Sequence, residues 1–160
     1  MNLVDRSSRL LVARIGALRE AVRHARDRSP FHIDAWVVLP DHMHCMWTLP
    51  QNDADFSARW KAIKTRFSKS VPTIEHRSAV NRRRGERGVW QRRFWEHTIR
   101  DDRDYAAHMD YIHFNPVEHG HVQTAADWLF SSFHRCAANG IYPPSWRGTD
   151  SEPPEAGESR

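Results

Sequence analysis

Two histidines one residue apart, His42 and His44, are the residues in this chain whose types and spacing first suggest chemistry. Alternate side chains of an extended strand share a face, so the two imidazoles would lie together, with their Cα atoms about 6.6 Å apart. Met43, Cys45 and Trp47 would then point to the opposite, buried face, and we expect the histidine face to be open. Such a pair can clamp a divalent metal. Two histidines also occur on solvent-facing strands without a ligand, so the spacing alone leaves both interpretations open.

A tyrosine and an asparagine lie one helical turn apart in the segment DYIHFNP, residues 110–116. The apolar spacing predicts a helix over residues 103–115, ended by Pro116. Tyr111 and Asn115 would share one side of it, about 100° from the apolar stripe, and we expect neither in the core. The asparagine oxygen could complete a metal site, and tyrosine is a recognised covalent nucleophile. The alternative is a half-buried aromatic beside a polar helix end.

Of five further histidines, two are weaker candidates for the site. His97 could donate to a phosphate, orient a ligand or face solvent, and His108, one helical turn before the tyrosine, is similarly placed. We expect His113, His119 and His121 at the surface, because exposed histidine is the ordinary case.

The middle of the chain is strongly basic although the net charge is only +4. Residues 59–103 contain 14 Lys and Arg against 5 Asp and Glu, interleaved with Trp90, Phe94 and Trp95. Arginine matches phosphate oxygens and aromatic rings stack on bases, so this block favours a nucleic-acid surface over a solvated loop. The predicted DNA contacts are Arg92, Arg93, Arg100 and Arg103, with Lys64, Arg82, Arg83 and Arg84 as further members.

The remaining elements follow from hydrophobic spacing. We expect a helix over residues 8–28 and a β-hairpin over residues 31–49. A second helix from Asp55 would have a basic, solvent-facing side that begins with Arg59. Residues 71–88 are predicted to form a loop or arm, and residues 89–100 have strand composition.

Length and composition indicate one domain, because 160 residues with 39% apolar content can bury a single core. No run of about 18 apolar residues and no signal peptide are present, so we expect a soluble, cytoplasmic protein without membrane partners. Cys45 and Cys136 lie far apart in the sequence and are expected to be reduced thiols.

Several segments together resemble a known family. PDHMH, WQRRFWEHTIRDDRDY and YIHFNPVEHG, followed by WLFSSFHR and YPPSW, look like the REP-associated tyrosine transposases, a branch of the single-tyrosine HUH nucleases. The likeness extends from about Arg9 to Gly148. It implies an α+β, ferredoxin-like (RRM-type) antiparallel sheet with helices on one face and the HUH motif on a central strand. The transposase-like domain would span residues 1–148, and residues 149–160 would form a disordered acidic tail.

The resemblance also implies a reaction. His42 and His44, with Met43 as the hydrophobe between them, would bind Mg²⁺ or Mn²⁺, and Asn115 would be the third ligand. Tyr111 would attack a phosphodiester of single-stranded DNA, leaving a 5′-phosphotyrosine link and a free 3′-hydroxyl. Family substrates are repeated extragenic palindromes folded as hairpins with a short flanking tetranucleotide. The protein would act on them as a monomer or a homodimer.

One departure from the family and two alternatives complete the expectations. Family members usually have a longer extended stretch before the first helix, of which Met1 to Val4 is the counterpart, so we expect either an upstream start or a sheet that lacks its first strand. A missing strand would leave backbone groups unpaired and reduce stability or activity. The alternative functions are a non-catalytic hairpin-DNA-binding module and a zinc hydrolase using His42 and His44 with His97 or His108.

Overall fold

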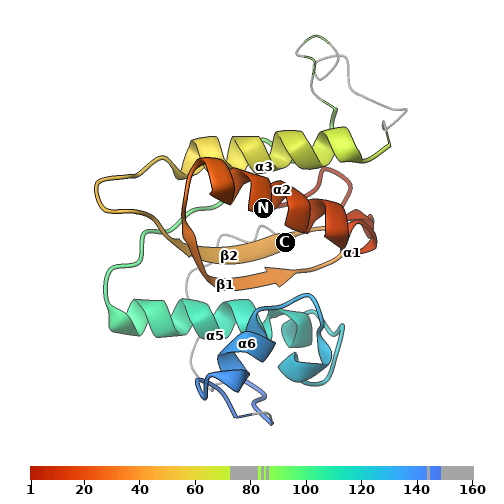
Figure 1. Ribbon diagram of the computed structural model, residues 1–160. Helices are drawn as coiled ribbons and strands as arrows, with labels where there is room; N and C mark the ends of the chain where they lie inside the picture. Colours follow the sequence, from red (N-terminus) through yellow and green to blue (C-terminus); the bar gives the residue numbers. More distant parts are fainter. Residues whose placement is uncertain (73–82, 84, 86, 144, 149–160) are drawn as a thin grey trace. The chain divides into compact units, whose positions relative to one another are not determined.

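The computed structural model describes residues 1–72, 83, 85, 87–143 and 145–148. The chain forms two compact units, each assembled from separate stretches (Figure 1). The N-terminal unit contains Met1–His32, Pro40–His42 and Thr48–Phe94, and the C-terminal unit contains Ile33–Leu39, Met43–Trp47 and the described residues from Trp95 on. The predicted domain boundary at residue 148 and the acidic tail lie at or beyond the edge of the described residues and stay predictions.

The described part of the N-terminal unit contains the helices α1 (Leu10–Ala13), α2 (Ile15–Arg28) and α3 (Phe56–Ser70). The single helix predicted over residues 8–28 is interrupted at Arg14, whose backbone leaves the helical conformation (φ −118°, ψ 31°). Helix α2 packs against α3, and the two lie side by side in Figure 1. The apolar stripe predicted for α3 is confirmed, since Trp60, Ile63 and Phe67 are buried.

Helix α3 begins at Asp55, whose side chain accepts a hydrogen bond from the amide of Ala58 (2.9 Å). The prediction that Arg59 lies on the solvent-facing side of this helix is wrong, because its side chain is 3% exposed. It donates to both carboxylate oxygens of Asp53 (3.0 and 2.6 Å) and to three backbone carbonyls, those of Ser29, Pro30 and Asp55. These hydrogen bonds hold the pKa of Asp53 down at about 2. Arg59 therefore stabilises the start of α3 through buried hydrogen bonds, whereas the sequence suggested a charge that faces DNA.

The N-terminal residues pair on both sides within the same unit. Asn2 forms an antiparallel bridge with His42, and Leu3 forms one with Trp90. The amide of Leu3 donates to Asp41 (2.8 Å), and that of Gln91 donates to Asn2 (2.9 Å). The short extended segment is thus hydrogen-bonded on both sides, to residues 41–42 and to residues 89–91. The prediction of a strand over residues 89–100 is wrong, because Trp90 is the only one of these described residues that forms a β-bridge.

A β-hairpin is confirmed in the C-terminal unit, although its outermost residues, His32 and Thr48, belong to the other unit. Its strands are β1 (His32–Val38) and β2 (Met43–Thr48). The described helices of this unit are α5 (Asp102–Glu118), the short 3₁₀ turn η1 (Ala125–Asp127) and α6 (Phe133–Ala138). Helix α5 runs alongside the hairpin in Figure 1. The core of the unit joins strand and helix residues: Ala35, Val37, Leu39, Met46, Met109, Ile112, Ala125, Phe133, Cys136 and Tyr142.

Helix α5 does not end at Pro116 as predicted, but continues to Glu118. A proline in the last turn removes one hydrogen bond, the one its absent N–H would donate four residues back. The turn beyond it is closed in a Schellman arrangement, in which the amide of His121 donates to Pro116 and that of Gly120 to Val117 (both 2.9 Å). Gly120 supplies the left-handed backbone that this motif requires (φ +68°).

Two other expectations concern cysteine and membranes. Cys45 and Cys136 are both free thiols, as predicted, and burial raises the pKa of Cys45 to about 12. Among the described residues, no helix combines the length and the apolar character that a membrane span requires.

The Arg59 network leads to a stability prediction. Arg59→Met removes the guanidinium and leaves the carbonyls of Ser29 and Pro30 without their donor, so the free energy of unfolding should fall by about 3 kcal/mol. Arg66→Met on the same helix is the control, because Arg66 makes an exposed ion pair with Glu20 (2.7 Å), and such pairs contribute about 0–1 kcal/mol. Urea unfolding monitored by circular dichroism measures both changes. Equal losses in the two variants would contradict this account.

Candidate active site

His44 of β2 faces helix α5. Met46, two residues further on the same face of the strand, belongs to the core cluster that includes Met109 and Ile112 of α5. The His44 ring meets the edge of the Tyr111 ring, with centroids 5.3 Å apart and planes at 83°. The expectation of an open histidine face is therefore wrong, because the face that carries His44 is covered by a helix.

Tyr111 and Asn115 both lie on α5 with the predicted one-turn spacing. Tyr111 is half-buried and packs against the core cluster. Asn115 is 0% exposed, so the prediction that it lies outside the core is wrong. Neither its amide oxygen nor its amide nitrogen has a hydrogen-bond partner among the described residues. Burying an amide in this way is unfavourable unless something binds to it, which makes Asn115 a candidate ligand rather than a packing residue.

His42 belongs to the N-terminal unit and is 2% exposed. Its Nδ1 lies 2.8 Å from a carboxylate oxygen of Asp41, whose other oxygen pairs with Arg6 (2.9 Å). An imidazole that donates from Nδ1 carries its lone pair on Nε2, and a carboxylate behind the ring is the usual support of a metal-binding histidine. This is the local bonding that a metal-binding histidine would need.

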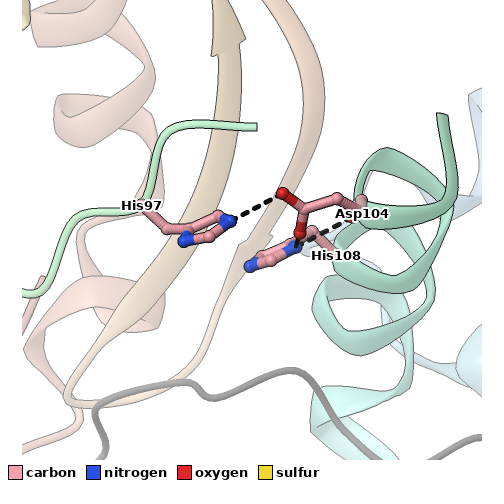
Figure 2. A group of neighbouring side chains, drawn as sticks. All are labelled: His97, Asp104 and His108. Carbon is pink, nitrogen blue, oxygen red and sulfur yellow. Dashed lines mark hydrogen bonds and ion pairs between the residues drawn. The ribbon is translucent and has the colours of Figure 1, made fainter. Parts of the chain in front are cut away.

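A second polar cluster joins His97, Asp104 and His108 within the C-terminal unit (Figure 2). His97 Nε2 lies 2.7 Å from Oδ2 of Asp104, and His108 Nδ1 lies 3.0 Å from its Oδ1. The hydrogen bond from His97, with help from Arg100, outweighs burial and holds the pKa of Asp104 well below its ordinary value. The three side chains are of the types that hold divalent cations, and their candidate ligand atoms all lie within 4.8 Å of one another.

Sequence reasoning singled out both of these histidines and missed Asp104. The signal was present, because Asp104 precedes His108 by four residues on a predicted helix and so had to lie beside it.

The predicted DNA contacts differ in their surroundings. The side chains of Arg83, Arg92, Arg93, Arg100 and Arg103 are exposed. Arg100 also donates from Nε to Asp104 (3.3 Å), and Lys64 donates to the carbonyl of Gln91 (2.7 Å). Arg82 and Arg84 lie outside the described residues. Five of the eight candidates thus present charge to solvent, where a phosphate could meet it.

Of the three histidines expected at the surface, His119 and His121 are exposed and His113 is not. His113 is 0% exposed and lies between Ser132 Oγ (2.8 Å) and the Tyr142 hydroxyl (3.3 Å). Burial, with the charge of Arg135 adding to it, lowers the pKa of His113 to about 4. Both ring nitrogens are occupied, so this histidine holds α5 to the segments after it.

Comparisons with known proteins identify the family. No protein-family model matches the chain. A REP-associated tyrosine transposase of Escherichia coli is 47% identical over 148 residues, which are 92% of this chain and 82% of that protein. The chain belongs to the REP-associated tyrosine transposases. This confirms the family inferred from the motifs.

Two more relatives agree with this assignment. A putative REP-associated tyrosine transposase of Haemophilus influenzae is 44% identical over 147 residues, 91% of this chain and 84% of the relative. A solved structure of a REP-associated tyrosine transposase bound to a REP hairpin is 46% identical, has a TM-score of 0.83, and covers 99% of this chain and 88% of its own.

The burial of His113 predicts a pH dependence of stability for this transposase. Its folded pKa of about 4 lies below the ordinary value of 6.5. Between pH 4 and pH 6.5, His113 is therefore protonated in the unfolded chain and neutral in the folded chain. Stability from this group is complete above about pH 6.5 and declines as the pH falls towards 4, by up to about 3 kcal/mol.

Chemical unfolding of the wild type and His113→Gln at pH 7 and pH 4.5 tests this. The variant should be less stable at pH 7 but lose less on acidification, whereas His119→Gln, an exposed control, should behave as the wild type. The same acid-induced loss in wild type and His113→Gln would show that another group is responsible.

Proposed function

We propose that this chain is a metal-dependent, sequence-specific single-stranded DNA endonuclease and strand transferase that acts on palindromic REP-type hairpins through a 5′-phosphotyrosine intermediate. The observation that carries the proposal is the edge contact between His44 and Tyr111, with the unpartnered Asn115 amide one turn further along α5. The hairpin in the relative's structure supports the substrate class. We assign the chemistry to a ferredoxin-like sheet of which β1 and β2 are two strands.

His42, His44 and Asn115 are the proposed ligands of Mg²⁺ or Mn²⁺. The buried Asn115 oxygen fits this role, because a cation would satisfy an acceptor that has no donor among the described residues. Two neutral imidazoles and one oxygen suit a divalent ion of the first transition series. The assignment of His42 depends on the motif and on its bond to Asp41. When bound, the ion would supply positive charge to the phosphate oxygens on which negative charge develops.

Tyr111 is the proposed nucleophile. Its phenol oxygen forms a bond to phosphorus while the bond from phosphorus to the 3′-oxygen breaks, leaving DNA linked to the tyrosine through its 5′-phosphate. The packing of Tyr111 against His44 and the core restricts its ring, so the hydroxyl is held for attack with little freedom to lose. The released 3′-hydroxyl, or another one, can reverse the step without ATP because one phosphodiester has replaced another.

Basic residues are proposed to hold the DNA backbone. The exposed Arg92, Arg93 and Arg103 offer guanidinium groups to phosphates, and Arg100 would share its charge between Asp104 and the DNA. We retain Lys64, Arg82, Arg83 and Arg84 as further contacts. Because each phosphate contact releases counterions, binding should weaken steeply as salt increases.

Tyr111→Phe separates this function from a hairpin-binding module. The wild type, incubated with a single-stranded hairpin oligonucleotide and Mn²⁺, should give a covalent adduct on a denaturing gel. The variant lacks the attacking oxygen and should give none, while its Kd for the hairpin stays within about twofold. Tyr105→Phe is the matched control, since Tyr105 lies on the same helix with its hydroxyl on Asp34 (3.3 Å), and should keep the adduct. Adduct formation by Tyr111→Phe would refute the assignment.

Asn115→Ala tests the metal site separately from catalysis. A ligand that binds only the folded state stabilises it by mass action, so Mn²⁺ at about 100 times its Kd should add about 2.7 kcal/mol to the unfolding free energy of the wild type. The gain should be much smaller in Asn115→Ala and unchanged in Asn139→Ala, which alters an exposed asparagine at the end of α6. Thermal unfolding with and without Mn²⁺ gives these values. A full Mn²⁺ effect in Asn115→Ala would exclude this residue as a ligand.

A further inference from the structure

The cluster in Figure 2 has a defined arrangement of protons. His97 Nε2 and His108 Nδ1 each face an oxygen of Asp104, and His108 Nδ1 also faces the backbone carbonyl of the same residue (2.9 Å). An ionised carboxylate and a carbonyl only accept hydrogen bonds, so both of these ring nitrogens carry the hydrogen. The lowered pKa of Asp104 agrees with an ionised carboxylate. In the neutral rings, the lone pairs are therefore on His97 Nδ1 and His108 Nε2, which point away from Asp104 in Figure 2.

His108 Nε2 is the unusual atom of the cluster. The residue is 8% exposed, and Nε2 is shielded from solvent with no hydrogen-bond partner among the described residues. The ring cannot turn freely, because it is stacked on His97 (centroids 4.6 Å apart, planes at 10°) and lies nearly parallel to Trp95 (6.1 Å, 14°). A buried, oriented acceptor without a donor requires an explanation beyond packing.

His108 Nε2 could accept either a metal ion or a proton, and the orientation of the ring planes favours the proton. A metal ion lies near the plane of each imidazole that binds it. Because the planes of His97 and His108 are only 10° apart and stacked, their lone pairs run side by side rather than converging on one point. In this hydrogen-bonded form the cluster is arranged for proton transfer at a single nitrogen, with Asp104 fixing the tautomer as in carboxylate–histidine–nucleophile systems.

The nearest nucleophile along the chain is Tyr111. His108 and Tyr111 are three residues apart on α5, and such pairs are neighbours on a helix surface with Cβ atoms about 5–6 Å apart. Helical side chains lean towards the N-terminus, so the tyrosine leans over the turn that carries His108. Tyr105 is not an alternative source of the proton, since its hydroxyl already donates to Asp34.

We propose that His108, oriented by Asp104, is the general base that removes the phenol proton of Tyr111. This inference rests on the proposed function. In the cleavage step the proton passes from the Tyr111 oxygen to His108 Nε2 as the bond to phosphorus forms, and the departing 3′-oxygen takes a proton from water. The resulting imidazolium is stabilised by the Asp104 carboxylate, and the proton returns to the phenol oxygen when the link is reversed. Among the described residues, Asp104 binds His108 directly, His97 and Arg100 bind the same carboxylate, and Tyr111 is the titratable neighbour one turn further along α5.

The test is the pH profile of single-turnover adduct formation with a REP-type hairpin and Mn²⁺. His108→Gln should form the adduct about 10²–10⁴ times more slowly at pH 7 than the wild type. The wild-type rate should rise with pH as the imidazole loses its proton, and His108→Gln should lack this rise, so the deficit should grow with pH. The hairpin Kd should stay the same. Asp104→Asn should show a smaller loss of the same kind, and His119→Gln, an exposed histidine beyond the end of α5, should show none.

Two results would overturn the proposal. A wild-type profile in both His108→Gln and His108→Asn would show that no proton passes through this residue. A deficit of the same size at every pH would show a structural role, and circular dichroism of the two variants identifies such a loss of folding. Failure of the proposed function has a different signature, because the wild type would then form no adduct that depends on Tyr111.

Discussion

The packing of α5 along the β1–β2 hairpin is the constraint on which the candidate active site depends. Met46 belongs to the same buried cluster as Met109 and Ile112 of the helix, and the two-residue period of a strand places His44 on the same face as Met46. The apolar contacts therefore determine where the imidazole lies, and the helix supplies Tyr111 beside it. The proposed nucleophile and the proposed metal ligand come together because their apolar neighbours share one core, which holds them more firmly than a loop could.

Three buried polar residues of α5 show how stability and function divide along this helix. His113 has partners at both ring nitrogens and so serves the fold. Asn115 has no partner at either amide atom, and His108 has none at Nε2, among the described residues. Such groups reduce stability, and they persist where a ligand or a reacting group completes them. They lie on either side of Tyr111 in the helix, which is the placement that metal binding and proton removal at one phenol would require.

The sequence predicted the elements that depend on local spacing. The hairpin and the stripe of α3 follow from apolar periodicity, and the one-turn spacing of Tyr111 and Asn115 follows from helix geometry. What it did not predict depends on hydrogen-bond partners that hydrophobic spacing does not reveal. Arg59 looks like a surface charge until Asp53 and the carbonyls of Ser29 and Pro30 surround it. Pro116 looks like a helix end, but α5 continues to Glu118 and is closed there by the Schellman hydrogen bonds.

The central claim is that Tyr111 works beside a divalent ion held by His44 and Asn115. Anomalous diffraction at the manganese edge, from crystals of Tyr111→Phe with a REP-type hairpin and Mn²⁺, tests it most directly, because the ion is located without reference to activity. The account predicts an anomalous peak at about 2.2 Å from a ring nitrogen of His44 and from the side-chain oxygen of Asn115. A fully occupied peak bonded to other residues, with Asn115 still unpartnered, would contradict it.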